Sequence, residues 1–330
     1  MNPFQYSKAK SADAAINGYM EHDNTAYLAG GTNLVDRIRR DVTHPDYLID
    51  VSELPFSKIE KIEGGLRLGA MASNSDTADD ENVKNDYPIV SEAILLGATD
   101  QLRNKATNGG NLMQRTRCSY YMSPHFACNK REPGSGCDAI DGHNRILSVL
   151  GTSEKCIASY PSDMCTALAA LDAVVQIQTP NGGKRSLPLV DFRRLPGDSP
   201  EIDTNLKEGE LITSIDLPES SKAFAKASHY LKVRDRHSYA FALVSVAAAL
   251  VMENNMIKDA RMALGSVAAK PWRDQEAEAM FIGKKPSREL FEKIAEKTME
   301  GAKGYGENDF KIELGKRAIV KAFMKVAGLS

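Results

Sequence analysis

The sequence lacks the features that would mark a membrane protein or an exported chain. No run approaches the roughly 20 apolar residues that a membrane-spanning helix needs. The most apolar stretch, 239–252, is shorter and rich in alanine, which predicts a buried core element. The first residues show neither an apolar core nor a cleavage-site pattern, so we expect no export signal on this chain. It would stay in the cytoplasm, or reach the periplasm already folded with a signal-bearing partner.

The sequence also has almost no excess of charge of either sign. There are 42 Lys and Arg against 44 Asp and Glu among 330 residues, which gives a net charge of −2. A nearly neutral chain exerts no long-range attraction on nucleic acid or on an anionic membrane, so neither partner is expected. The length allows two or three domains, each with its own core.

Several motifs of common enzyme classes are missing. There is no G-x-G-x-x-G fingerprint and no P-loop, so a bound nucleotide would require a different fold. The six histidines, which include His44, His125, His143 and His237, show no metal-site spacing and are predicted to be surface or packing residues. No G-x-S-x-G motif is present, which gives hydrolysis little support.

Two glycine-rich segments stand out among the features that are present. The first, 29–34 (AGGTNL), joins a strand-like start at 27–28 to an amphipathic helix at 34–40, and the second is 107–112 (TNGGNL). Paired glycines let backbone N–H groups approach an anion such as a diphosphate. Since the segments lie about 78 residues apart and both contain Thr and Asn, we expect them to hold the two sides of one dinucleotide. The alternative is two unrelated surface turns.

Cysteine usage points to a cofactor. Four of the five cysteines, Cys118, Cys128, Cys137 and Cys156, lie within 39 residues with spacing C-x9-C-x8-C-x18-C. Zinc sites usually contain a short C-x2–4-C pair, and none occurs here. Dispersed thiolates suit a [4Fe–4S] cluster, and structural zinc is kept as the alternative. Cations between the ligands, Lys130 and Arg131, would offset the negative charge of such a cluster. The fifth, Cys165, is predicted to be a small packing residue.

The remaining pattern predicts mixed helices and strands. A boundary is expected at 218–227, a hairpin turn at Asn254-Asn255, terminal helices within 288–329, and a loop at 196–200 that covers a site or only connects elements. A helix is expected to end near Leu102, because Gly109-Gly110 must break it. The expected strands are 4–6, 47–51, 59–62, 66–70, 174–178, 186–190, 211–217 and 257–264, and the expected helices include those from about 11, 34–40, 75–80 and 89–96.

These motifs carry a family resemblance. AGGTNL at 29–34, TNGGNL at 107–112, PSD at 161–163 and YLKVRDRHSYA at 230–240 resemble the FAD-binding subunits of molybdenum hydroxylases, the xanthine dehydrogenase family, over essentially the whole chain. In most members the serine–aspartate motif follows the second glycine motif closely. Here 48 residues, 113–160, intervene, and they contain all four clustered cysteines.

The insertion indicates which branch of the family this chain resembles. It is similar to that of the aldehyde oxidoreductase branch, whose flavin subunit binds a [4Fe–4S] cluster, and benzoyl-CoA-type reductases have a comparable insertion. The segments RTRC, ACNKREPGSGC and KCIASYPSDM favour the aldehyde branch. The resemblance implies an α+β chain: a FAD-binding domain of the vanillyl-alcohol-oxidase (PCMH) type at 1–220, in subdomains of about 1–55 and 56–220, then a CO-dehydrogenase-flavoprotein-like domain at 221–330.

The resemblance also implies site residues. It assigns no catalytic residue to this chain, and it places Lys232 near the flavin ring, where its charge would stabilise the anionic reduced flavin. The alternative for Lys232 is a surface charge beside Arg234 and Asp235. The implied FAD-binding residues are Tyr27, Leu28, Ala29, Gly30, Gly31, Thr32, Asn33, Leu34, Thr107, Gly109, Gly110, Asn111, Asp163 and Lys232, and the implied [4Fe–4S] ligands are Cys118, Cys128, Cys137 and Cys156.

The implied function is electron transfer within a heterotrimer. A large molybdenum-cofactor subunit would oxidise an aldehyde, a small [2Fe–2S] subunit would carry the electrons, and FAD here would pass them to an external acceptor such as a quinone, ferredoxin, oxygen or NAD. The alternatives are a flavin subunit of xanthine dehydrogenase or of a benzoyl-CoA-type reductase, a free-standing FAD oxidase, and a zinc-stabilised scaffold without a redox role.

Overall fold

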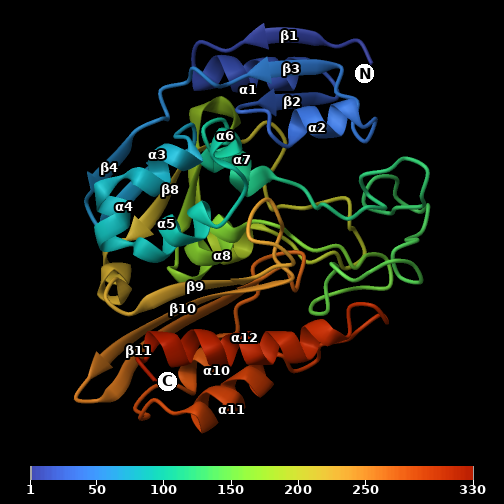
Figure 1. The fold of residues 1–330 in the computed structure, drawn as a ribbon. Coiled ribbons are helices and arrows are strands. Elements are labelled where there is room, and N and C mark those ends of the chain that lie inside the picture. Colours follow the sequence, from blue (N-terminus) through green and yellow to red (C-terminus); the bar gives the residue numbers. More distant parts are fainter. Residues whose placement is uncertain (1, 330) are drawn as a thin grey trace.

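The chain folds around three separate β-sheets, which follow one another down the molecule from the N-terminal to the C-terminal part (Figure 1). The computed structural model describes residues 2–329. Two sheets have three strands and the middle one has five. No helix among the described residues is both long and apolar enough to cross a membrane.

The N-terminal sheet is parallel because each of its two connections contains a helix. Strand β3 lies between β1 and β2, and its register pairs Asp50 with Leu28, the last residue of β2. Ser11 caps the first helix by accepting a hydrogen bond from the Ala14 backbone N–H. The first glycine motif therefore begins directly at the carboxyl end of β2. The elements are β1 (Gln5–Lys8), α1 (Ala12–Glu21), β2 (Thr25–Leu28), α2 (Leu34–Arg39) and β3 (Tyr47–Asp50).

The middle sheet is antiparallel, in the order β4-β5-β8-β6-β7, and contributes to the largest core. Leu68, Val175 and Ile215 are fully buried in that core, against a layer of helices. The strands are β4 (Ile59–Ile62), β5 (Gly65–Gly69), β6 (Val174–Gln178), β7 (Lys184–Pro188) and β8 (Leu211–Pro218). The helices of this part are α3 (Asn74–Asp79), α4 (Glu81–Asp86), α5 (Pro88–Leu95), α6 (Asp100–Arg103), α7 (Asn108–Met113), α8 (Asp163–Ala170) and α9 (Leu189–Phe192).

Two local predictions in this part are wrong. The preceding helix, α6, does end at Arg103, close to the predicted Leu102, but Gly109 and Gly110 do not break it and belong to α7, whose N-terminus is capped by the Thr107 hydroxyl. The strand expected at 186–190 ends at Pro188, and the next four residues form α9. In both places tertiary packing outweighs local propensity.

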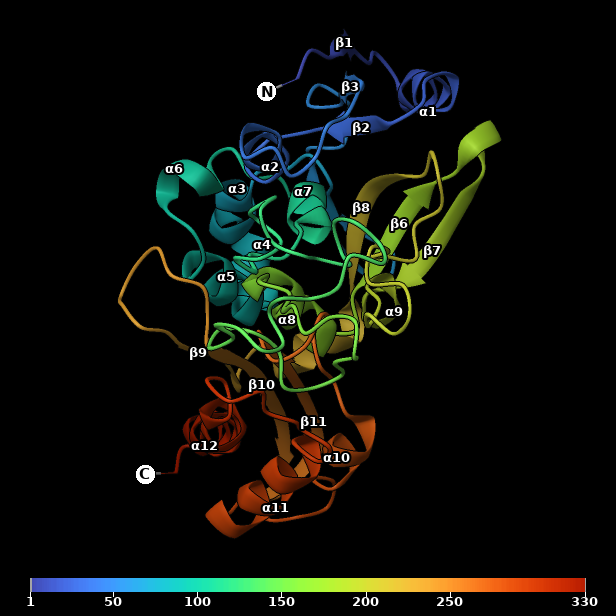
Figure 2. The same ribbon diagram turned by 90° about the vertical axis from the view of Figure 1, so that its right-hand side faces the viewer.

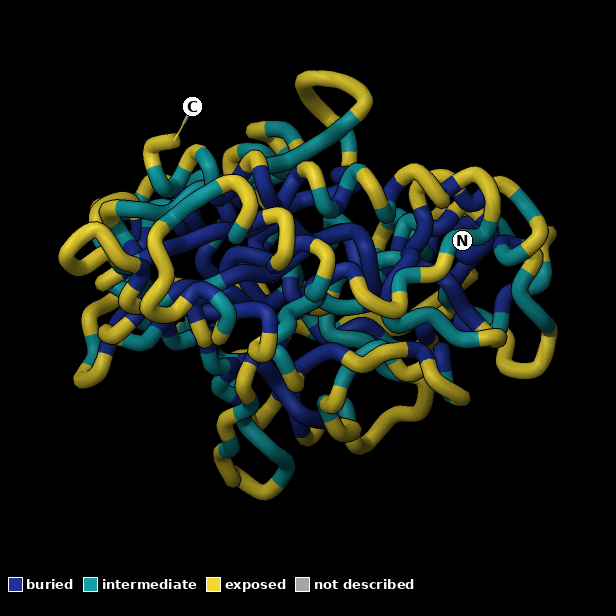
Figure 3. The backbone as a smooth tube through the Cα atoms, turned by 90° about the horizontal axis from the view of Figure 1, so that it is seen from below, coloured by how far each residue is buried: buried dark blue, intermediate teal, exposed yellow. Residues whose placement is uncertain are grey.

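The C-terminal sheet explains the alanine-rich run. Its strands β9 (Ser228–Val233), β10 (Val244–Glu253) and β11 (Met256–Gly265) are antiparallel, and Asn254 and Asn255 both have positive φ in the predicted hairpin turn. Alternate residues of β10 belong to different cores, so both faces of the strand are buried. The backbone is correspondingly buried through the centre of the molecule in Figure 3. The helices after this sheet are α10 (Gln275–Ala279), α11 (Arg288–Thr298) and α12 (Phe310–Val326).

The insertion is an ordered loop region without helices or strands between α7 and α8. It faces the viewer in Figure 2, in front of α8. Its own small core contains Tyr121, Leu147 and Ile157 together with the clustered cysteines. Lys311, at the start of α12, is buried and donates hydrogen bonds to the carbonyls of Ile146, Leu147 and Ser266. These bonds tie the insertion to the C-terminal sheet and helices.

Candidate functional site

The two glycine motifs border one cavity of about 570 Å³. Its volume falls within the range of ligand-binding clefts. Residues 206–212, which the sequence did not single out, close another side, and Tyr27 donates a hydrogen bond from its hydroxyl to the Gly209 carbonyl at 3.0 Å. Of the predicted residues, those that line the cavity are Tyr27, Ala29, Gly30, Gly31, Thr32, Asn33, Leu34, Thr107, Gly109 and Gly110.

The glycines are required by close backbone approaches around this cavity. A Cβ atom on Gly30 would lie 1.7 Å from the Lys105 carbonyl oxygen, so the first motif packs directly against the segment that precedes α7. Gly109 donates its backbone N–H to the Ala70 carbonyl at 2.8 Å, and a Cβ there would lie 3.2 Å from the Ala70 side chain. The two motifs are thus held side by side.

Two buried donors at this cavity have no protein partner. Asn33 Nδ2 and Arg37 Nε are inaccessible to solvent, and neither makes a hydrogen bond with the described residues. Both residues line the cavity. Buried polar atoms are almost always paired in native proteins. An anionic, acceptor-rich ligand such as a diphosphate would satisfy both donors, so the residues present fit a dinucleotide.

Asn111 lies behind the cavity and joins the second glycine motif to the serine–aspartate motif. Its Nδ2 donates to Asn74 Oδ1 at 2.8 Å, and its Oδ1 accepts a hydrogen bond from the Ser162 hydroxyl at 2.6 Å. Tyr160 donates its hydroxyl to the Asn111 carbonyl at 3.0 Å. The insertion therefore leaves the two motifs in contact, although it separates them by 48 residues in the sequence.

Asp163 and Lys232 form a buried ion pair. Lys232 Nζ lies 2.7 Å from Asp163 Oδ2, and the two side chains are 1% and 8% exposed. The Leu96 carbonyl also accepts from Lys232, and Tyr230 donates its hydroxyl to Asp163 Oδ1 at 2.9 Å. The alternative that Lys232 is a surface charge is therefore wrong. Neither residue of the pair lines the glycine cavity, and neither do Leu28 and Asn111.

The insertion brings its four cysteines into one small core. Cys118, Cys128 and Cys156 are buried in it, with Cys137 packed against it, and Cys128 pairs with Cys137 in an isolated antiparallel bridge. All four are free thiols. Burial raises the pKa of Cys118 to about 12 and that of Cys156 to about 11. The Ala158 N–H donates to Cys156 Sγ at 3.4 Å.

Other candidate ligands do not join these cysteines. Among residues 2–329, no three His, Cys, Asp or Glu side chains are close enough to share a single metal ion. The four histidines named from the sequence are exposed. Cys165 is buried in the main core, as predicted, where it lies 3.0 Å from the Tyr160 hydroxyl.

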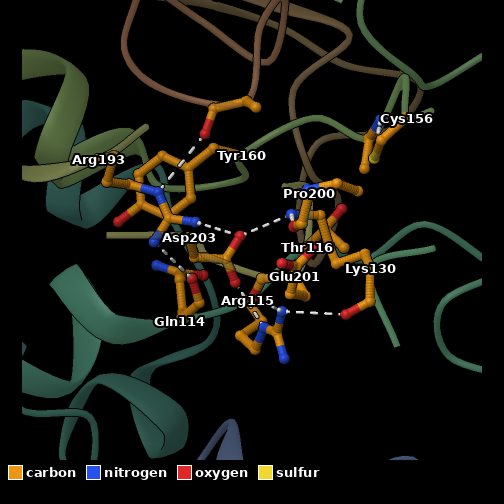
Figure 4. Close-up of polar contacts among 12 residues, drawn as sticks. Gln114, Arg115, Thr116, Lys130, Cys156, Tyr160, Arg193, Pro200, Glu201 and Asp203 are labelled. Carbon is orange, nitrogen blue, oxygen red and sulfur yellow. Dashed lines mark hydrogen bonds and ion pairs between the residues drawn. The ribbon is translucent and has the colours of Figure 1, made fainter. Parts of the chain in front are cut away.

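Lys130, which the sequence suggested as a cation near the cysteines, belongs to a buried charged group that sequence reasoning did not predict. This group, the Asp203 cluster, consists of Arg115, Lys130, Arg193 and Asp203 (Figure 4). All three cations form ion pairs with the one carboxylate. Burial opposes ionisation of Asp203, but the three positive charges hold its pKa well below the usual range. No local pattern pointed to Asp203, because its partners come from distant segments.

Comparison with known proteins gives two family matches that together cover most of the chain. The family described as "FAD binding domain in molybdopterin dehydrogenase" matches residues 2–220. The family described as "CO dehydrogenase flavoprotein C-terminal domain" matches residues 229–326.

Individual relatives match nearly end to end. The chain is 43% identical to the aldehyde oxidoreductase FAD-binding subunit PaoB of Escherichia coli (strain K12), over 97% of this chain and 96% of that protein. It is 28% identical to the glyceraldehyde dehydrogenase medium chain of Sulfolobus acidocaldarius, over 98% of each. A putative xanthine dehydrogenase FAD-binding subunit, XdhB of Escherichia coli, is 22% identical over 89% of this chain and 85% of that protein.

Solved structures share the fold. A chain of reconstituted CO dehydrogenase from Oligotropha carboxidovorans superposes with a TM-score of 0.78 at 19% identity, covering 100% of this chain and 99% of that one. Quinoline 2-oxidoreductase from Pseudomonas putida 86 gives a TM-score of 0.75 at 22% identity, covering 99% and 98%. The predicted fold, a FAD-binding domain followed by a CO-dehydrogenase-flavoprotein-like domain, is confirmed.

Proposed function

The chain belongs to the family of FAD-binding subunits of molybdopterin dehydrogenases, and from this membership we propose that it carries FAD in an aldehyde-oxidising molybdenum hydroxylase. In this role it oxidises no substrate itself. It receives electrons from partner subunits and passes them to an external acceptor. The single observation that carries the proposal is the convergence of two distant glycine motifs on one cavity with two unpaired buried donors.

The glycine cavity binds the diphosphate part of FAD. Gly30, Gly31 and Gly110 line the cavity without side chains, and Asn33 and Arg37 supply the donors that lack partners in the described part of the protein. Tyr27, Ala29, Thr32, Leu34, Thr107 and Gly109 line the rest of the cavity, while Leu28 and Asn111 support the two motifs from behind.

The Asp163–Lys232 pair acts on the isoalloxazine ring of the flavin. When bound, FAD supplies a carrier that exchanges electrons one or two at a time. Lys232 keeps a buried positive charge oriented by Asp163 and the Leu96 carbonyl, and this charge favours the anionic reduced form. No residue of this chain needs to act as a catalytic base.

The cysteine insertion holds a [4Fe–4S] cluster on Cys118, Cys128, Cys137 and Cys156. Support comes from the four free thiols that share one small core and from the Ala158 N–H, which donates a hydrogen bond to Cys156 Sγ. Protonated thiols with raised pKa values are disfavoured as ligands, so cluster assembly would proceed with loss of their protons. The spacing of the four cysteines includes no short C-x2–4-C pair of the kind usual in zinc sites, so a cluster is preferred over structural zinc.

The partners are a large molybdenum-cofactor subunit and a small [2Fe–2S] subunit. The aldehyde branch is preferred over the xanthine branch because identity is 43% to an aldehyde oxidoreductase subunit and 22% to a xanthine dehydrogenase subunit. Both matches extend over most of the chain, so the difference does not reflect partial coverage.

Affinity purification of the tagged chain from its native host tests this proposal. We expect two other subunits, FAD, molybdenum, iron and acid-labile sulfide in the complex, and oxidation of aldehydes but not of xanthine with an artificial acceptor. A folded chain that purifies alone, without flavin and without iron, would refute the proposed function. Zinc in place of iron and sulfide would remove the cluster but leave the flavin role intact.

A further inference from the structure

The Asp203 cluster carries an unbalanced positive charge. Lys130 Nζ lies 2.7 Å from Asp203 Oδ1 and Arg193 lies 3.3 Å from the same oxygen, while Arg115 pairs with the other oxygen. Lys130 and Arg193 are each only 4% exposed at the side chain. Within residues 2–329, Asp203 is the only carboxylate that pairs with any of these three cations. One negative charge thus faces three positive ones.

Carbonyl groups stabilise these cations without neutralising them. Lys130 donates to the Pro200 carbonyl, Arg115 donates to the Glu201 carbonyl, and Arg193 donates to the Leu112 carbonyl and stacks on the Tyr160 ring at 3.8 Å. Hydrogen bonds to neutral groups leave the net charge unchanged. Because uncompensated buried charge is strongly unfavourable, an anionic group is expected nearby.

The cysteine core is where such an anion would lie. Lys130 is two residues from Cys128, Arg115 is three residues from Cys118, and both lie in the insertion or at its start. In Figure 4, Lys130 and Cys156 lie on the same side of the carboxylate. A [4Fe–4S] core bound by four thiolates is a dianion and gains a further negative charge on reduction.

We infer that Lys130 is the buried counter-charge of the cysteine site, positioned by Asp203, and that it raises the reduction potential of the cluster held there. This inference rests on the cluster assigned under the proposed function. One electron, supplied by the reduced flavin or a reduced [2Fe–2S] centre of the same complex, enters the cluster, and no bond or proton is exchanged. A fixed cation stabilises the more negative state most, so it favours reduction.

Potentiometric titration of the purified complex, followed by the EPR signal of the reduced cluster, tests the inference. Lys130→Gln should lower the reduction equilibrium constant at least about tenfold, which equals 59 mV for one electron. Lys130→Arg keeps the charge and should remain near the wild-type potential. Lys155→Gln is the matched control, because Lys155 adjoins Cys156 but is half exposed and pairs with Asp198 at 3.2 Å; its charge is screened by solvent.

Iron and sulfide content distinguishes the failure of this inference from failure of the proposed function. A wild-type complex without iron refutes the cluster itself. A Lys130→Gln complex that retains iron at the wild-type potential, or that shifts no more than Lys155→Gln, overturns the role of Lys130 while the cluster stands. If the Lys130→Gln complex lacks iron but the Lys130→Arg complex contains it, the site requires the positive charge, as inferred. If both complexes lack iron, the inference is contradicted.

Discussion

Lys232 Nζ and Asp163 Oδ2 lie 2.7 Å apart in an almost fully buried environment, and they come from opposite sides of the boundary between the two family domains. Asp163 begins α8 of the FAD-binding part, which packs against α5 and against β10 and β11, whereas Lys232 lies on β9 of the C-terminal sheet. This pair is one of several ion pairs that connect the FAD-binding part to the C-terminal part, and it is the one at the place proposed for the flavin ring.

Removing one partner of this pair should destabilise the protein. Lys232→Met leaves the Asp163 carboxylate buried without its counter-charge, and we expect the free energy of unfolding to fall by about 3–5 kcal/mol. Urea unfolding of the flavin-free chain would measure the loss. The double variant Asp163→Asn with Lys232→Met should recover part of it, because no uncompensated charge remains.

Lys258→Met is the control for this prediction, since Lys258 forms an exposed pair with Glu253 and such pairs contribute about 0–1 kcal/mol. If Lys232→Met proved no more destabilising than Lys258→Met, the buried pair would not have the structural role described.

Asn33 should be a principal contact of the diphosphate. Its Oδ1 already accepts a hydrogen bond from the Arg115 N–H at 3.2 Å, which leaves Nδ2 as the donor for a ligand. Asn33→Ala should weaken FAD binding about tenfold to a hundredfold, because a hydrogen bond to a charged group contributes about 1.5–3 kcal/mol. Asn33→Asp should bind FAD more weakly still, because the new carboxylate would repel the phosphates. Fluorescence titration of the flavin-free chain measures both.

Asn85→Ala, on the exposed side of α4, supplies the matched control and should bind FAD normally. Wild-type affinity in Asn33→Asp would show that no phosphate lies at this side chain.

Gly30 should tolerate no side chain. In Gly30→Ala the new Cβ would collide with the Lys105 carbonyl, so the first motif must move away from the segment before α7. We expect FAD occupancy of the purified complex to fall at least about tenfold while the C-terminal sheet remains folded. Gly182→Ala is the control. Gly182 lies in an exposed turn with φ +74°, and a Cβ there would have no atom within 4 Å, so this variant introduces backbone strain without a collision. Equal occupancy in the two variants would contradict the close packing of the motifs.

Stability should rise with pH in a window set by Lys311. Burial lowers the pKa of Lys311 from 10.5 to about 7. Between these values the unfolded chain binds a proton that the folded chain does not, so stability increases with pH by at most about 1.4 kcal/mol per unit. This contribution is lost as the pH falls to about 7. Lys311→Met should therefore show a smaller slope between pH 7 and 9 in urea unfolding.

Lys321→Met, at an exposed position of the same helix, should keep the wild-type slope. If Lys311→Met also kept it, Lys311 would not be deprotonated in the folded protein over this range.

The sequence predicted those features that local pattern determines. The strands at 174–178 and 211–217 and the hairpin at Asn254-Asn255 follow from alternation and turn residues, and the structure contains all three. The glycine motifs could be recognised because a close backbone approach requires glycine wherever it occurs. Their convergence on one cavity was an expectation from chemistry, and the structure now supplies the geometry.

The parts that sequence did not predict depend on long-range packing. The α7 helix forms across two glycines because Thr107 caps it and Ala70 lies against Gly109. The cap is a local feature, but the Ala70 contact comes from a distant segment that helix propensity does not take into account. Asp203 forms buried ion pairs with Arg115 and Lys130, which lie more than 70 residues away in the chain. A lone aspartate in a turn-rich segment gives no sign of such partners.

Hydrogen–deuterium exchange of the purified chain with and without FAD tests the shared flavin site most directly. Two separate segments, 29–34 and 107–111, should both become protected when FAD binds, and to a similar extent, since they border the same cavity. Protection of only one segment, or of neither at saturating FAD, would show that the two glycine motifs do not hold one nucleotide.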